Sequence, residues 1–131
     1  MPSTNALRVG AIVALTLTTA YIHLTLGGLL FTLNGVGYLM LAAGVVLTAA
    51  IPRPAARRFA WLARLGLAGY TSATILGYLV LGPHFLLGWV TKAIERVLVG
   101  LVAVDLLITY RGPIGLLREA VRSLGLERRF S

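Results

Sequence analysis

The sequence predicts an all-α membrane protein with four transmembrane helices, arranged as two tight hairpins and followed by a short C-terminal amphipathic helix. Three observations predict this class. Hydrophobic residues make up 58% of the 131 residues, only 12% are charged, and the mean hydropathy is +0.89. Soluble domains are about 45–50% apolar and about 25% charged. The apolar residues form runs near the ~20 residues that cross a bilayer, and glycine or proline separates the runs.

The first expected span covers about residues 7–26, with a single arginine, Arg8, at its start. A secretory signal has this form, but no small-residue cleavage site clearly follows the run, and more apolar runs come after it. We therefore expect a retained first span. Its end is ambiguous, because the turn could fall at Gly27-Gly28 or at Asn34-Gly35. The first choice gives two spans of suitable length, so we place the turn at Gly27-Gly28 and Asn34 inside the second span.

The remaining spans are separated by proline and arginine. Proline cannot continue a helix, so Pro52 and Pro54 end the second span, and an arginine-rich loop covers residues 52–58. Gly82-Pro83 forms the second tight turn. The expected spans are about 7–26, 29–51, 59–81 and 85–110.

The arginines predict the orientation. With four spans, ten of the twelve cations fall on the side that holds both termini and the 52–58 loop, and only Lys92 and Arg96 fall on the other. Cytoplasmic loops are enriched in lysine and arginine. We therefore expect a multi-pass protein of the plasma membrane with both termini in the cytoplasm. The net charge of +8 then reflects topology, and no nucleic-acid partner is expected.

Two regions follow from this division: a bundle over residues 1–112 and a basic cytoplasmic tail over residues 113–131. The tail is amphipathic between residues 114 and 124, with arginines off the apolar face. We expect a short helix on the anionic cytoplasmic leaflet; a solvated extension of the fourth span or a frayed tail is the alternative. The apolar face consists of Leu116, Leu117, Ala120, Val121 and Leu124.

Polar residues inside the spans are costly and each needs an explanation. Several of them fall at similar depth near the two tight turns, where converging faces would form a polar pocket in the outer leaflet. Such a pocket could hold a quinone head group, a polar solute or a proton relay. The alternative is that the histidine only bonds to a threonine or carbonyl and that the lysine snorkels to the head groups. The candidate pocket residues are His23, Asn34, Tyr38, Tyr78, Lys92 and Glu95.

Asp105 lies near the cytoplasmic end of the fourth span, where an unpaired carboxylate would be costly. The cytoplasmic halves of the first and third spans carry Arg8 and Arg64. We predict an ion pair between Asp105 and Arg64 that fixes the register of the helices.

No motif for catalysis or phosphate binding occurs, and cysteine is absent. We therefore expect a protein that is not an enzyme, with no catalytic residue and no metal site. A haem held by the two histidines, His23 and His84, lacks any supporting motif, so no cofactor is expected. The small and hydroxyl residues favour close helix packing. They predict a structural or accessory subunit that forms homo-oligomers or joins a larger membrane complex. The alternatives are a carrier for a small solute or ion, or a protein that binds quinone or haem near His23.

Overall fold

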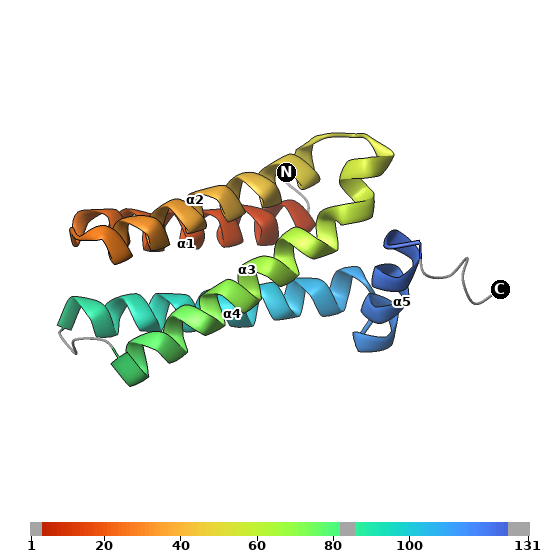
Figure 1. Cartoon of the computed structure of the whole chain (residues 1–131). Coiled ribbons are helices and arrows are strands. Elements are labelled where there is room, and N and C mark those ends of the chain that lie inside the picture. The colour runs from red at the N-terminus through yellow and green to blue at the C-terminus, as the bar shows by residue number, and fades with distance from the viewer. Residues whose placement is uncertain (1–3, 82–85, 126–131) are drawn as a thin grey trace.

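The computed structural model describes residues 4–81 and 86–125, and within these ranges it is all-helical. Four long helices are followed by a short one that crosses the end of the bundle (Figure 1). The helices are α1 (Thr4–Thr25), α2 (Leu29–Ala50), α3 (Pro54–Leu81), α4 (Leu86–Thr109) and α5 (Pro113–Ser123).

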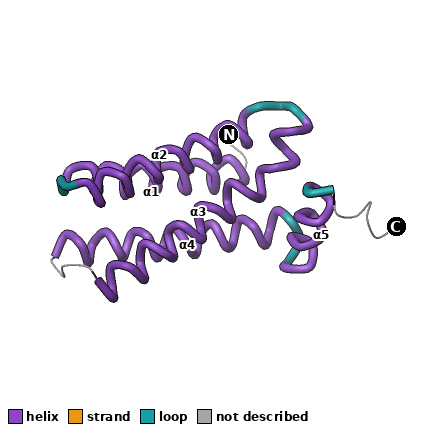
Figure 2. Tube along the Cα trace, viewed as in Figure 1, coloured by secondary structure: helices purple, strands orange, loops and turns teal. Residues whose placement is uncertain are grey.

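The four long helices form a closed ring in chain order. Each packs against its neighbours in the sequence, and α4 also packs against α1. Figure 2 shows that the described loops between the helices are short, so successive helices run in opposite directions. We name the two ends of the bundle after residues that lie there. The Gly27 end holds the α1–α2 turn, and the Pro54 end is where α3 begins and α5 packs.

The first turn lies at Gly27 and Gly28, the position preferred from the sequence over Asn34-Gly35. Both glycines have positive φ angles, 75° and 86°, a region that residues with a side chain rarely adopt. Asn34 therefore lies within α2, as expected. The expected second turn, Gly82-Pro83, and His84 lie outside the described residues.

The connection between α2 and α3 is shorter than the sequence suggested. The expected loop at 52–58 is wrong for most of its length, because α3 begins at Pro54. Proline is well tolerated in the first turn of a helix, where its missing N–H group would have no partner in any case. Arg57 and Arg58 thus lie on the first turns of α3.

The bundle buries polar groups and exposes apolar ones. Thr19, Glu95 and Asp105 have no exposed surface, whereas Val80 and Leu86 are 77% and 81% exposed. An apolar core still runs along the axis of the bundle. It consists of Ile12, Ala20, Tyr38, Val45, Leu67, Leu98, Val102 and Leu106.

Two of the described helices, α1 and α2, are long and apolar enough to cross a membrane, whereas the sequence predicts four such spans. α4 is too highly charged to count as an apolar span, because it carries Lys92, Glu95 and Arg96 close together in the sequence. The mean hydropathy of α3 is lowered by its arginine, glycine and hydroxyl residues. The two apolar helices favour association with a membrane.

Candidate functional site

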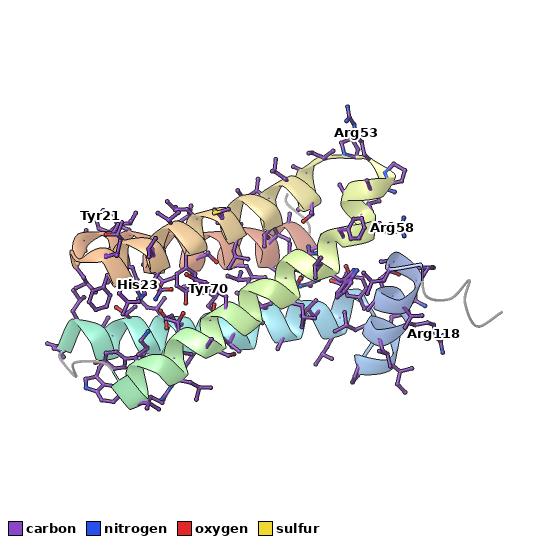
Figure 3. The ribbon with its side chains drawn as sticks, in the orientation of Figure 1. Tyr21, His23, Arg53, Arg58, Tyr70 and Arg118 are labelled. Atoms are coloured by element: carbon purple, nitrogen blue, oxygen red, sulfur yellow. The ribbon has the colours of Figure 1, made fainter. Side chains whose placement is uncertain are left out.

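A cavity of about 540 Å³ opens between α2 and α3 at the Gly27 end of the bundle. Side chains of all four long helices line it. Figure 3 shows His23 and Tyr70 directed into the space between the two helical hairpins, whereas Tyr21 and Arg53 point outward. The lining residues are His23, Leu30, Phe31, Leu33, Asn34, Tyr70, Ala73, Thr74, Gly77, Tyr78 and Lys92.

The helical period places these side chains together. Tyr70, Thr74 and Tyr78 follow one another at intervals of four residues, so they form one stripe on α3. His23 lies in the last turn of α1, and Lys92 lies in the second turn of α4. Because neighbouring helices are antiparallel, these positions lie at a similar height in the bundle.

A buried network connects α1 and α4 beneath the cavity. The Thr19 hydroxyl donates a hydrogen bond of 2.9 Å to Glu95 Oε1. His23 Nδ1 lies 2.7 Å from the Thr19 carbonyl oxygen, which can only accept, so Nδ1 carries hydrogen. His23 Nε2 lies 3.8 Å from Glu95 Oε1. Nε2 is thus the ring nitrogen that can take up or release a proton beside the cavity.

Lys92 and Glu95 neutralise each other within α4. Lys92 Nζ lies 2.8 Å from Glu95 Oε2, and both side chains are buried. The ammonium group also lies 5.1 Å from the centre of the Tyr78 ring, a favourable cation–π distance. With a neutral histidine, the polar part of the site carries no net charge.

Several hydrogen-bond donors beside the cavity are unused within the described residues. An ammonium group has three donors, and within the described residues that of Lys92 donates a hydrogen bond to Glu95 alone. Asn34 receives hydrogen bonds at its carbonyl oxygen from Tyr70 (2.9 Å) and at Oδ1 from Thr74 (3.4 Å). Its side-chain amide donates to no described residue. The site is therefore rich in donors.

Aromatic rings form the inner wall of the site. Tyr38 is fully buried; its ring lies 5.6 Å from that of His23 and 4.9 Å from that of Tyr70, the latter edge to face. The Tyr38 hydroxyl is close to the hydroxyls of Thr71 and Thr74, but no contact of the Tyr38 hydroxyl has hydrogen-bond geometry. The contacts within this wall are therefore mainly between ring faces and edges and not between hydroxyl groups.

Two glycines make room for the tyrosines. A Cβ atom at Gly37 in α2 would collide with the Tyr70 hydroxyl, and one at Gly88 in α4 would collide with the Tyr78 hydroxyl. Both collisions involve the ring end of a tyrosine that lines the cavity. The absence of a side chain at these two positions therefore sets where the rings lie.

A second polar cluster lies toward the Pro54 end. Asp105 Oδ2 is 2.7 Å from Arg64 Nε, an ion pair without hydrogen-bond geometry, so the pair predicted from the sequence is present. Arg8 Nε donates a hydrogen bond of 3.0 Å to the other oxygen, Oδ1. Asp105 thus connects α1, α3 and α4.

Four of the six pocket residues predicted from the sequence line the cavity: His23, Asn34, Tyr78 and Lys92. Tyr38 and Glu95 lie behind them, in contact with His23 and Lys92. Sequence reasoning missed Phe31 and Tyr70 as lining residues. The spacing of four residues between Tyr70 and Thr74 was the available signal for Tyr70.

The site combines a cavity, hydrogen-bond donors and a histidine nitrogen that can exchange a proton. Within residues 4–81 and 86–125, no three His, Asp or Glu side chains gather in a way that could hold a metal ion. No protein-family description, curated protein or solved structure matches the chain. The function is therefore argued from the geometry of the site.

Proposed function

We propose that this protein is a four-span membrane protein whose cavity binds a neutral molecule with a carbonyl-bearing head group and an apolar tail. The observation that supports four membrane spans is the distribution of polarity, because the bundle buries charged residues and exposes apolar ones. In the most apolar segments of α1 and α2, only 28% and 22% of the residues are buried inside the bundle. A core helix of a soluble protein would be mostly buried, whereas a helix surrounded by lipid exposes its apolar residues.

Four charged residues of α3 and α4 are compatible with two further spans. Arg64, Lys92, Glu95 and Asp105 are at most 5% exposed and are paired with one another inside the bundle. Charged residues within membranes face the interior of a bundle and pair there. The mean hydropathy of a helix counts buried and exposed residues alike. The mean hydropathy of α3 and α4 is therefore lower than that of the surface they expose.

The Pro54 end fits the cytoplasmic surface. Ile114 and Leu117 of α5 remain 71% and 65% exposed, although α5 is anchored to α3 by reciprocal hydrogen bonds between Arg58 and Ser123. An apolar stripe beside arginines suits a helix that lies at an anionic membrane surface. Both termini are then cytoplasmic, and the cavity faces the outer leaflet.

The chemistry of the cavity restricts the ligand. Its polar part is neutral and rich in donors, so it suits an uncharged head group that carries acceptor oxygens. Its rim is apolar, since Leu30 and Leu33 are 76% and 58% exposed. The cavity opens between two helices, which gives access from the lipid. A quinone ring with an isoprenoid tail has these properties, and His23 Nε2 can supply or accept its proton.

Membrane topology is tested with single cysteines, because the chain has none of its own. Arg53→Cys and Leu86→Cys are labelled with an impermeant maleimide in oriented vesicles. Four spans place the two positions on opposite sides of the membrane. Labelling of both from the same side would overturn the proposal.

Ligand binding is tested on the purified protein in nanodiscs with short-tailed benzoquinone and naphthoquinone analogues. Trp89, whose ring lies 5.4 Å from that of Tyr78, reports binding through quenching of its fluorescence. We expect saturable quenching, and Asn34→Leu should weaken binding about fivefold, since a lost hydrogen bond contributes ~1 kcal/mol.

The most direct test compares a variant whose new side chain fills the cavity with a matched variant whose new side chain lies outside it. Gly77 lines the cavity and Gly69 lies on the outer surface of the same helix; a Cβ atom at either position meets no other atom within 4 Å. Gly77→Leu should abolish quinone binding, and Gly69→Leu should leave it unchanged. Equal affinity of the two variants, or the absence of saturable quenching in the original protein, would refute a quinone-type ligand.

A structural or accessory role within a larger membrane complex is a second candidate. It is favoured by one observation, the exposed side chain of Arg96 on α4, and it does not conflict with the ligand site, because Arg96 does not line the cavity.

A further inference from the structure

One face of α4 is exposed and apolar except for a single arginine. Trp89 and Val97 on this face are 45% and 60% exposed, and Arg96 between them is also exposed. Gly100 follows one turn later, and a Cβ atom there would meet nothing within 4 Å. Neither of the two polar clusters described above includes Arg96.

Arg96 lies near the middle of its helix. It follows Leu86 by ten residues, about 15 Å, and precedes Thr109 by thirteen, about 20 Å. In a bilayer with a core of ~30 Å, four spans therefore place it near mid-membrane. Arginines near the ends of a span reach the head groups with their long side chains, but a central arginine facing lipid is costly and requires a partner.

The chain offers no such partner among its described residues. It has four acidic residues, of which Glu95 and Asp105 are fully buried and already paired. Glu119 lies in α5 and pairs with Arg122. Glu127 lies outside the described residues, in the tail that the proposed topology places in the cytoplasm.

A second copy of the chain does not solve this problem. A symmetric dimer through the exposed face of α4 would bring one Arg96 toward the other, and like charges repel. Neither copy would present a carboxylate at this depth, because Glu95 and Asp105 point into their own bundle. The missing negative charge must come from a different molecule within the membrane.

We propose that the Arg96 face of α4 binds a transmembrane helix of another membrane protein that carries an aspartate or glutamate at mid-membrane. The charge complementarity sets the chemistry of the partner, and the lack of a side chain at Gly100 permits close approach of its backbone. This inference depends on the four-span topology proposed above, and it is independent of the cavity, which is lined by other residues.

The test uses full-length protein in lipid vesicles and designed transmembrane peptides as partners. The peptides are leucine-alanine helices with a central glutamate, glutamine or leucine, and association is measured by energy transfer between labels. We expect the glutamate peptide to bind the protein at least about tenfold more tightly than the leucine peptide. Arg96→Leu should remove this preference, and Arg96→Lys should retain most of it.

Two results would overturn the proposal. Equal binding of the glutamate and leucine peptides would show that no carboxylate is recognised. A homodimer in mild detergent that dissociates on Arg96→Leu would show that the face is covered by a second copy instead. Arg96 is exposed, so its substitution should leave the fold intact, and circular dichroism checks this.

Failure of the topology is recognised separately. Impermeant labelling of Leu86→Cys and Arg53→Cys in the same vesicles reports whether α4 crosses the membrane. Opposite-side labelling together with equal peptide binding refutes only the docking proposal. Same-side labelling refutes the four-span proposal on which the docking depends.

Discussion

Replacement of Asp105 by alanine should destabilise the bundle more than any other removal of a single charge at the Pro54 end. The carboxylate is fully buried and lies 2.7 Å from Arg64 Nε and 3.0 Å from Arg8 Nε. Asp105→Ala leaves the Arg64 guanidinium, whose side chain is 6% exposed, without a counter-charge. Removal of one member of a buried ion pair costs about 3–5 kcal/mol, or roughly two to three and a half powers of ten in the folding equilibrium.

Arg8→Ala should cost less. The Arg8 side chain is 16% exposed, and its loss leaves Asp105 paired with Arg64. We expect about 1.5–3 kcal/mol, the contribution of one hydrogen bond to a charged group. The double variant Arg64→Ala with Asp105→Ala should be less destabilised than the sum of its single variants, because no uncompensated guanidinium remains in the core.

Unfolding in mixed micelles, titrated with dodecyl sulfate, measures these free energies. Trp61 is 5% exposed and lies one helical turn from Arg64, so its fluorescence reports on this region. The reasoning fails if Asp105→Ala costs no more than Arg8→Ala. It fails equally if the double variant shows simple additivity, because independent residues would then be responsible.

Two further predictions concern helix packing, and both use the purified protein. A Cβ atom at Gly35 would lie 2.8 Å from Leu24 Cγ and 3.0 Å from a backbone carbonyl of α1. Gly35→Ala should therefore lower stability by about 1 kcal/mol despite better helix propensity, whereas Gly100→Ala, at an open helical position, should raise it; the same effect of both in the micelle titration would contradict this geometry. Ser123 donates a hydrogen bond of 2.8 Å to the Arg58 carbonyl, so Ser123→Ala should weaken the docking of α5 by about 1 kcal/mol. Amide exchange should accelerate in α5 but not in α2, and uniform acceleration would argue against a local anchor.

The sequence located the first turn and the paired charge near the Pro54 end for local reasons. Gly27 and Gly28 adopt positive φ angles, which the glycine pair allows at little steric cost. Asp105 needs a counter-charge wherever its helix is buried, and few arginines lie at its depth. α3 begins at Pro54 and not near residue 59 as the sequence predicts, because proline ends a preceding helix but also fits the first turn of the next one.

The composition of the cavity could be predicted only in part. His23, Asn34, Tyr78 and Lys92 were identified because polar residues are conspicuous in apolar segments. Phe31 was not, since nothing in the local sequence distinguishes a phenylalanine that lines a cavity from one that faces lipid. The role of Arg8 at Asp105 depends on which helices are neighbours, and this is decided by the ring of four helices.

Thus the sequence by itself determined the helical class, the apolar exterior and the identity of most polar residues, because composition and helical period act locally along the chain. Only the tertiary structure decided how polar groups of separate helices meet. It showed that Thr19 of α1 donates a hydrogen bond to Glu95 of α4, that Asp105 is shared by Arg8 as well as by the predicted Arg64, and that Arg96 alone among the charges near the middle of α4 faces outward. The physical reason is that pairing energies depend on distances of a few ångströms between separate helices, which no pattern within one helix specifies.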